Sequence, residues 1–169
     1  MRASLALAVL LLTACASKPP LPATAPWRGE PIPLAYVPAV YSLQWQKAEN
    51  RATCALIAPR SVGAEGEKAK PRAATFSGGW GVAYDLPELR SAFGVAGAGV
   101  SAGGDTYDQW PYVQDWGGGN RAEYGPEGGE GPNQLAYVRI AGQDCLYNVW
   151  SRLGRAHLEL LLRELRLVR

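Results

Sequence analysis

Residues 103–134 gather the side-chain types best suited to binding or chemistry in this chain of 169 residues. The segment reads GGDTYDQWPYVQDWGGGNRAEYGPEGGEGPNQ and holds nine glycines and six carboxylates against one arginine. A stretch of this length without a helix or strand is uncommon in a compact domain unless it is functional or disordered. Its aromatic residues argue against disorder. The candidate contact residues are Tyr107, Asp108, Trp110, Tyr112, Asp115, Trp116 and Tyr124.

Three roles fit this composition. Flat rings beside Asp, Asn and Gln suit a polysaccharide or a peptide, because the ring faces take apolar ligand surface while the polar groups fix orientation. A carboxylate pair such as Asp108 and Asp115 would instead serve hydrolysis of a polysaccharide, provided that the two groups converge. In the third role the rings cap a sheet and the glycines form turns. Binding or architecture, without catalysis, is the favoured interpretation, and an envelope hydrolase is the alternative.

Other catalytic constellations are weak. His157 is the only histidine, and a hydrolase built on Ser77 and His157 would need an orienting carboxylate, while FSGGWG lacks the Gly-x-Ser-x-Gly pattern. Residues 97–102, GAGVSA, partly match a dinucleotide-binding glycine pattern, but no βαβ unit follows. The aspartates of residues 103–134 lack calcium-loop spacing, and no His and Cys cluster suits zinc. We therefore expect no catalytic residue, no cofactor and no metal site.

The elements that position these residues are mostly strands. Residues 40–46, VYSLQWQ, alternate polar and apolar with a period of two, which predicts a half-buried strand. Asp85 and Glu88 form a capping-box pattern around Pro87, which predicts a short helix over 86–92. The remaining expectations are a strand over 52–58, a charged loop over 60–72, a strand pair across 73–85 and a strand within 93–101.

The clearest unit is a hairpin in residues 135–151, LAYVRIAGQDCLYNVWS. A two-residue turn at Gly142 and Gln143 matches the preference of type II′ turns for glycine in the first central place. That turn makes one face of the hairpin apolar. The predicted cross-strand pairs are Ile140 with Cys145, Val138 with Tyr147, and Ala136 with Val149.

The last segment, residues 152–169, predicts an amphipathic helix that covers the sheet. Its charged side chains largely face away from the apolar stripe. The predicted fold class is therefore α+β, a mostly antiparallel sheet of about five or six strands with this C-terminal helix packed on one face. The stripe comprises Leu158, Leu161, Leu162, Leu165 and Val168.

The start of the chain predicts an export signal. Arg2 supplies a short positive region, residues 3–12 are apolar, and small residues precede Cys15. The apolar run is too short to span a bilayer, which takes about 20 residues. Leu12, Thr13, Ala14 and Cys15 match the four places of a lipobox, so this segment resembles the signal of bacterial lipoproteins. The resemblance implies cleavage after Ala14 and lipidation of Cys15.

The resemblance also implies an address and a layout. Ala16, in place of an aspartate after the cysteine, favours the outer membrane, with the domain in the periplasm or at the cell surface. Residues 1–14 form the signal peptide, and residues 15–38 a lipidated cysteine with a Pro-rich tether that is largely extended. Trp27 and Tyr36 mark where the tether starts to pack. Residues 39–169 form one globular domain.

The expected partners follow from the address and the charge. The lipid anchor makes the membrane a partner, and a cell-wall polysaccharide or an envelope protein is the further candidate. A formal net charge of +2 gives no strong attraction for nucleic acid. With Cys15 assigned to lipid, Cys54 and Cys145 remain, and both lie in apolar strand patterns of an exported chain. They are therefore expected to form a disulfide.

Overall fold

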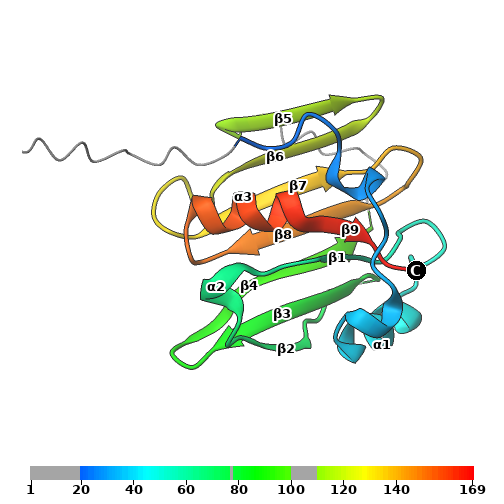
Figure 1. Ribbon diagram of the computed structural model, residues 1–169, viewed down its shortest axis with the longest axis horizontal. Helices are drawn as coiled ribbons and strands as arrows, with labels where there is room; N and C mark the ends of the chain where they lie inside the picture. The colour runs from blue at the N-terminus through cyan, green and yellow to red at the C-terminus, as the bar shows by residue number, and fades with distance from the viewer. Residues whose placement is uncertain (1–19, 77, 100–109) are drawn as a thin grey trace, which may run out of the picture.

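A computed structural model describes residues 20–76, 78–99 and 110–169. The predicted α+β class is confirmed, with a seven-stranded antiparallel sheet and the helix α3 packed on one face (Figure 1). The sheet has more strands than expected. Its strands, in chain order, are β2 (Lys70–Ala73), β3 (Trp80–Leu86), β4 (Leu89–Ala98), β5 (Tyr112–Gly117), β6 (Asn120–Pro126), β7 (Gln134–Arg139) and β8 (Leu146–Ser151).

The strand order across the sheet is β2-β3-β4-β8-β7-β6-β5. Hairpins supply most neighbours, and the pairing of β4 with β8 joins the two halves. A separate two-stranded sheet lies on the α3 side (Figure 1). The other elements are η1 (Pro26–Arg28), η2 (Leu34–Tyr36), α1 (Ala39–Lys47), β1 (Ile57–Pro59), α2 (Gly63–Gly66), α3 (Arg155–Glu164) and β9 (Leu165–Leu167).

The β7–β8 hairpin keeps the predicted register, because Ala136 pairs with Val149 and Val138 pairs with Tyr147. Its turn is not the predicted one. The Gln143 N–H donates to the carbonyl of the residue three positions earlier, at 3.1 Å, and residues 140–145 all lie between the strands. The Gln143 side chain explains the longer connection, since its Oε1 accepts from the backbone N–H of Ala55 at 2.9 Å.

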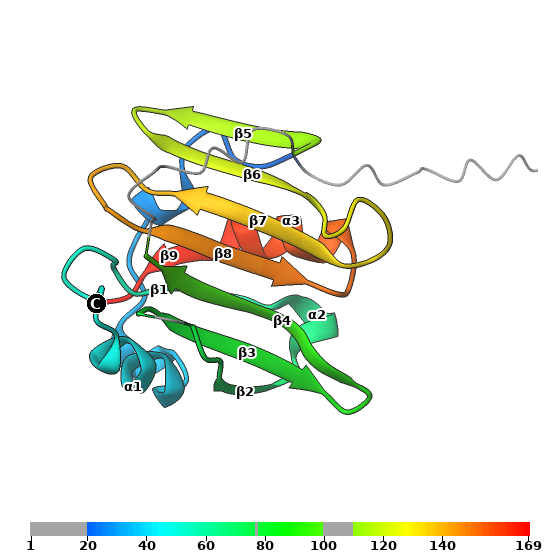
Figure 2. The ribbon, with the colours of Figure 1, turned by 180° about the vertical axis from the view of Figure 1, so that it is seen from behind.

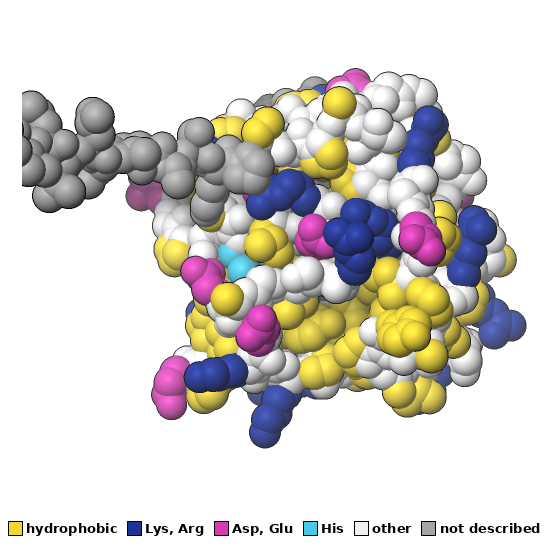
Figure 3. Space-filling model, in the orientation of Figure 1, with side chains coloured by type: hydrophobic (Ala, Val, Ile, Leu, Met, Phe, Trp, Pro, Cys, Tyr) yellow, Lys and Arg dark blue, Asp and Glu magenta, His cyan; other side chains and the backbone are white. Residues whose placement is uncertain are grey.

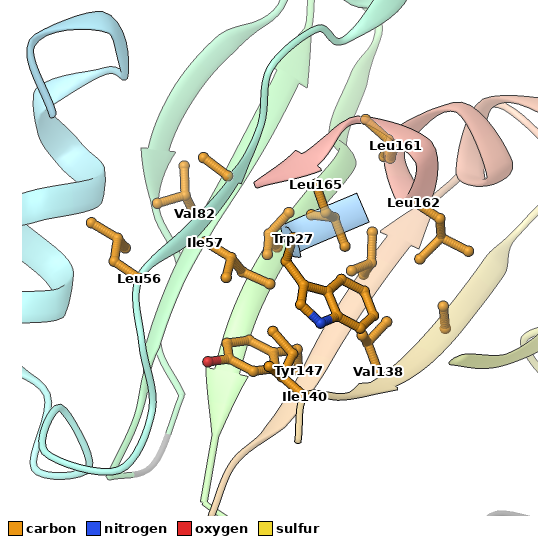
Figure 4. Close-up of a cluster of buried hydrophobic side chains, with 14 of the residues drawn as sticks. Trp27, Leu56, Ile57, Val82, Val138, Ile140, Tyr147, Leu161, Leu162 and Leu165 are labelled. Carbon is orange, nitrogen blue, oxygen red and sulfur yellow. The ribbon is translucent and has the colours of Figure 1, made fainter. Parts of the chain in front are cut away.

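The core lies between the sheet and the layer formed by α3, β1 and β9. The four leucines of the predicted stripe from Leu158 to Leu165 are fully buried. The helix ends at Glu164, before the predicted end, because Leu165 takes an extended backbone and starts β9, which pairs with β1. Figure 4 shows leucines of this layer facing Val138 and Tyr147 from the sheet.

The predicted disulfide between Cys54 and Cys145 is present, with Cα atoms 5.0 Å apart. It ties the segment before β1 to the start of β8. Both cysteines are buried. The bond therefore fixes the layer of β1 onto the sheet.

The described part of the predicted tether packs against the domain. Trp27 is only 3% exposed, and its indole N–H donates to Asn120 Oδ1 at 2.9 Å. Its ring lies within the core in Figure 4. Tyr36, the second expected packing point, is 81% exposed. Packing therefore begins before residue 39, as expected at Trp27, whereas Tyr36 does not pack against the domain.

Residues 40–46 form the helix α1, so the predicted strand is wrong. Tyr41 and Trp45 suited an alternating pattern, but their spacing of four also fits one side of a helix. Tyr41 is fully buried, and the Trp45 indole N–H donates to the Cys54 carbonyl at 2.8 Å. Pro38, immediately before α1, has the fixed φ that suits the start of a helix.

The predicted helix over 86–92 is also wrong, because these residues form the β3–β4 hairpin. Leu86 pairs with Leu89, which places Pro87 at the turn position that proline favours. Asp85 does not cap a helix. Its carboxylate accepts from the Ser91 N–H and from Arg72 Nε, both at 2.7 Å.

Three other expectations are corrected. The strand expected over 52–58 is reduced to the short β1. The loop expected over 60–72 contains α2 and the start of β2. Residues 103–134 contain the β5–β6 hairpin, whose turn takes glycines at positive φ, so they are not a long irregular loop. The strand expected within 93–101 is confirmed as part of β4.

Candidate functional site

The sheet face opposite α3 is called here the outer face. Side chains of a strand alternate between faces, so the buried inward residues Trp80 and Val82 place Gly81 on the outer face. The same alternation places Gly94 and Trp150, which pair across β4 and β8, on this face. Figure 2 shows the strands from this side, and no described helix lies over them.

Three aromatic rings of the outer face lie directly on glycines of the sheet. A Cβ atom at Gly94 would approach Trp150 Cζ2 to 2.2 Å, and a Cβ at Gly81 would approach Phe76 Cδ2 to 2.7 Å. Gly125 is covered by Trp110 and its neighbour Pro111 in the same way. Glycine in a strand often marks such close approach. The glycines therefore let the rings lie on the sheet surface.

A cavity of about 400 Å³ opens beside two of these rings, Phe76 and Trp150, whose centroids are 6.2 Å apart. This volume lies within the usual range of small-ligand sites, which is about 300–1,000 Å³. Apolar and polar groups both line it. The remaining lining residues are Ala74, Ser91, Glu127, Gln134, Leu135, Asn148 and Arg152.

The polar side of the cavity is held in place by hydrogen bonds. Ser91 has a φ of 51°, which residues other than glycine rarely adopt, and it is fixed there by Asp85 and Arg72. The hydrogen bond from Arg72, followed by that from the Ser91 N–H, lowers the pKa of Asp85. Arg152 donates to the Arg90 carbonyl at 2.9 Å. These groups are preorganised before any ligand arrives.

Gln134 lines this cavity but lies in phase with Ala136 and Val138, which face the core. The residue is 6% exposed, and its amide Nε2 donates to the Gly131 carbonyl at 3.2 Å. Its Oε1 has no hydrogen-bond partner among the described residues. A buried amide oxygen without a partner is unfavourable.

The predicted contact residues are divided between the two faces of the β5–β6 hairpin. Trp110 lies on the outer face, with its ring centroid 5.7 Å from that of Tyr137. Asp115 accepts from the Gly117 N–H at 2.7 Å and so fixes the β5–β6 turn. Tyr107 and Asp108 lie outside the described residues.

The other three, Tyr112, Trp116 and Tyr124, lie on the α3 side. Trp116 packs edge-on against Trp27 and donates to the Pro22 carbonyl at 2.8 Å. Tyr112 packs against the Tyr124 ring and against the Arg155 guanidinium, which is 4.6 Å from its centroid. These contacts are architectural, so the five described residues of the predicted set do not form one surface.

Tyr124 has a shifted pKa in this structure. Its hydroxyl donates to Glu159 Oε1 at 3.2 Å. Burial, followed by the charge of Glu159, raises the pKa of Tyr124 to about 12. The phenol therefore stays neutral at physiological pH and acts as a hydrogen-bond donor that holds β6 to α3.

His157 has a structural environment. Its Nδ1 lies 3.0 Å from Ser151 Oγ, and its Nε2 lies 3.0 Å from the Val62 carbonyl oxygen. Ser151 Oγ also accepts the Leu153 N–H. With Nε2 donating and Nδ1 accepting, the ring links α3 to β8 and to the residue before α2. Ser77, its suggested partner, lies outside the described residues.

The sequence interpretation missed Phe76, Tyr137 and Trp150. A signal for two of them was present in the predicted hairpin. With Val138 and Val149 facing inward, alternation sends Tyr137 and Trp150 outward, where large aromatic side chains are unexpected. Phe76 gave no comparable signal, because it precedes β3 and no periodicity includes it.

The described residues contain no group of three or more His, Cys, Asp or Glu side chains placed to hold a metal. None of the helices in that part of the chain is both long and apolar enough to cross a bilayer. No protein-family model, no curated protein and no solved structure matches this chain.

Proposed function

We propose that this chain is a lipid-anchored protein of the bacterial outer membrane that binds polysaccharide on its outer face, without catalysis. The observation that carries the binding role is the cavity beside Phe76 and Trp150, with its mixed lining. The faces of sugar rings carry C–H groups that stack on aromatic faces, and their hydroxyls pair with amide, carboxylate and guanidinium groups. Asn148 and Arg152 supply such partners at the cavity wall.

The small number of carboxylates at the cavity favours a binding role over hydrolysis. Glu127 is the only one among the described residues that line it. Glycoside hydrolysis generally uses two carboxyl groups on either side of the scissile bond. Asp115, one member of the suggested pair, is engaged at the β5–β6 turn. The alternative of an envelope hydrolase therefore receives no support from this cavity.

The anchoring proposal rests on the lipobox of Leu12, Thr13, Ala14 and Cys15. Cells that express the full chain should incorporate labelled palmitate into the protein, and Cys15→Ser should abolish both labelling and membrane association. Incorporation that persists in Cys15→Ser would refute lipidation at this residue.

Binding is tested with the chain from residue 20 onward and isolated cell-wall polysaccharide in a pull-down. Trp150→Ala and Asn148→Ala should each weaken binding at least several-fold. Tyr112→Ala, on the α3 side of β5, is the matched control and should leave binding unchanged. Circular dichroism establishes that each variant is folded, and assay of new reducing ends detects hydrolysis.

Wild-type protein that binds no cell-wall polysaccharide would overturn the proposed ligand class. Equal loss of binding in folded Tyr112→Ala and Trp150→Ala would show that the cavity is not the site. New reducing ends that disappear in Glu127→Gln would replace the binding role with the hydrolase.

A further inference from the structure

The described chain starts at the edge of the sheet formed by β5. Pro20 and Leu21 line a hollow together with Gln114 of β5 and Arg155 of α3. Two residues later, the Pro22 carbonyl accepts the Trp116 indole N–H. Figure 1 shows the first described residues running beside the β5–β6 hairpin. The chain is thus attached to this edge from residue 20 onward.

The covalent distance from this edge to the proposed anchor is short. Only residues 16–19 separate Cys15 from Pro20. Because an extended residue spans at most about 3.6 Å, the Cα atoms of Cys15 and Pro20 lie within about 18 Å of each other in any conformation. With about 4.8 Å between strands, β2 lies about 29 Å from β5 across six spacings. A lipid on Cys15 therefore holds the β5 edge close to the bilayer.

The chemistry of this edge suits a lipid surface. One side of β5 pairs with no described strand. Tyr112 and Val113 are 36% and 49% exposed, and the half-exposed Arg155 lies over the Tyr112 ring. Tyrosine is enriched where membrane meets water, and cations there attract anionic headgroups.

The carboxylates near this edge are already engaged. Asp115 binds the Gly117 N–H, Glu123 pairs with Arg121, and Glu159 accepts from Tyr124 and pairs with Arg155. Arg121 and Arg155 offset the charges of Glu123 and Glu159, which would otherwise oppose headgroup phosphates.

The opposite edge has different chemistry. There β2 carries Lys70, Pro71 and Arg72, residues that discourage strand pairing. The helix α1 lies at that end, and its Leu43 is 52% exposed, close to the value for Val113 (Figure 1). Figure 3 shows apolar side chains gathered around α1 and β1, far from the first described residues. When the β5 edge rests on the bilayer that holds Cys15, this second apolar surface lies too far away to touch the same bilayer.

We propose that the β5 edge, with Tyr112 and Val113, rests on the phospholipid surface that carries the anchor. The strands then run along the membrane, and the cavity beside Trp150 opens sideways above it. The orientation rests on the lipid anchoring proposed above, and the polysaccharide role does not depend on it.

Hydrogen exchange followed by mass spectrometry tests this orientation. The chain from Cys15 onward is coupled through its Cys15 thiol to a maleimide phospholipid in vesicles of phosphatidylethanolamine and phosphatidylglycerol. Amides of residues 112–117 should exchange several-fold more slowly in the coupled chain than in the free chain, while those of residues 39–47 should be unchanged. Val113→Asp should reduce the β5 protection, and the matched Leu43→Asp should not.

A flexible insertion of Gly and Ser residues between Ala16 and Pro20 should also weaken the protection, because it removes the limit on reach. Unchanged exchange over β5, or protection at α1 instead, would overturn the orientation. Coupling through maleimide keeps this result separate from natural lipidation, which the palmitate labelling tests in cells.

Discussion

Replacement of Trp27 by alanine should sharply destabilise the domain, although sequence reasoning places this residue in a tether. Trp27 is 3% exposed, lies edge-on against Trp116 at 5.1 Å and donates to the buried Asn120. A buried Trp→Ala substitution costs about 3–5 kcal/mol in other proteins. Asn120 Oδ1 still accepts from the Ala141 N–H at 3.1 Å, so the substitution leaves no buried acceptor without a partner. The loss of stability here should therefore stay within that range, at about 4 kcal/mol.

Urea unfolding followed by tryptophan fluorescence and circular dichroism measures this loss. With a slope of about 2 kcal/mol per molar urea, the midpoint should fall by about 2 M. Trp27→Phe keeps most of the packing but loses the indole N–H, so about 1–2 kcal/mol should be lost. Tyr36→Ala, in the same Pro-rich segment but 81% exposed, should change stability by less than about 0.5 kcal/mol. Equal, small effects of Trp27→Ala and Tyr36→Ala would refute the conclusion that this segment belongs to the domain.

Three further outcomes are expected. Gly94→Ala should destabilise the fold by about 2 kcal/mol and displace the Trp150 ring above it. Gly99→Ala, where an added Cβ would meet no described atom within 4 Å, should be neutral in the same urea titration. Loss of the Cys54–Cys145 bond, which joins residues 91 apart, should lower the unfolding free energy by at most about 4–5 kcal/mol. Urea unfolding with and without reductant measures this loss, and an unchanged midpoint would contradict it. Because the pKa of Tyr124 is about 12 in the folded chain against an ordinary 10.0, the unfolded state ionises first, so stability should fall as pH rises from 10 towards 12. Burial also raises the pKa of Tyr41, Tyr84 and Tyr147, so Tyr124→Phe should make that fall shallower without removing it. An identical pH profile would show that the Tyr124 phenol does not contribute.

The hairpin of residues 135–151 could be predicted because the alternation of its two strands and the pairing of their apolar residues indicate the same register. Ala136, Val138, Tyr147 and Val149 all face the core, so a register shift of one residue would expose them. The segment at Tyr41 lacked such agreement, because one short stretch fitted both a strand and a helix. Packing against β3 favours the helix in the folded chain.

The candidate site was less predictable for a geometric reason. Alternation within one strand would place Trp110 and Trp116, six positions apart, on the same face, but Trp110 precedes β5 and packs against Tyr137 on the outer face, whereas Trp116 packs against Trp27 on the α3 side. Gly94, which lies under Trp150, is 56 positions away on β4, and β4 and β8 are not consecutive strands of a hairpin. A single sequence gives the residue types of such a ring and glycine contact but not the register that joins them.

The backbone of residues 165–169 fastens distant parts of the chain together. The Ile32 N–H donates to the Leu167 carbonyl at 2.8 Å, the Leu34 N–H to the Arg169 carbonyl at 2.7 Å, and the Val168 N–H to the Leu56 carbonyl at 2.9 Å. The first described residues therefore cannot be secured until the last ones are in place. Local hairpins can form early in folding, but closure of the α3 layer needs the chain up to residue 169.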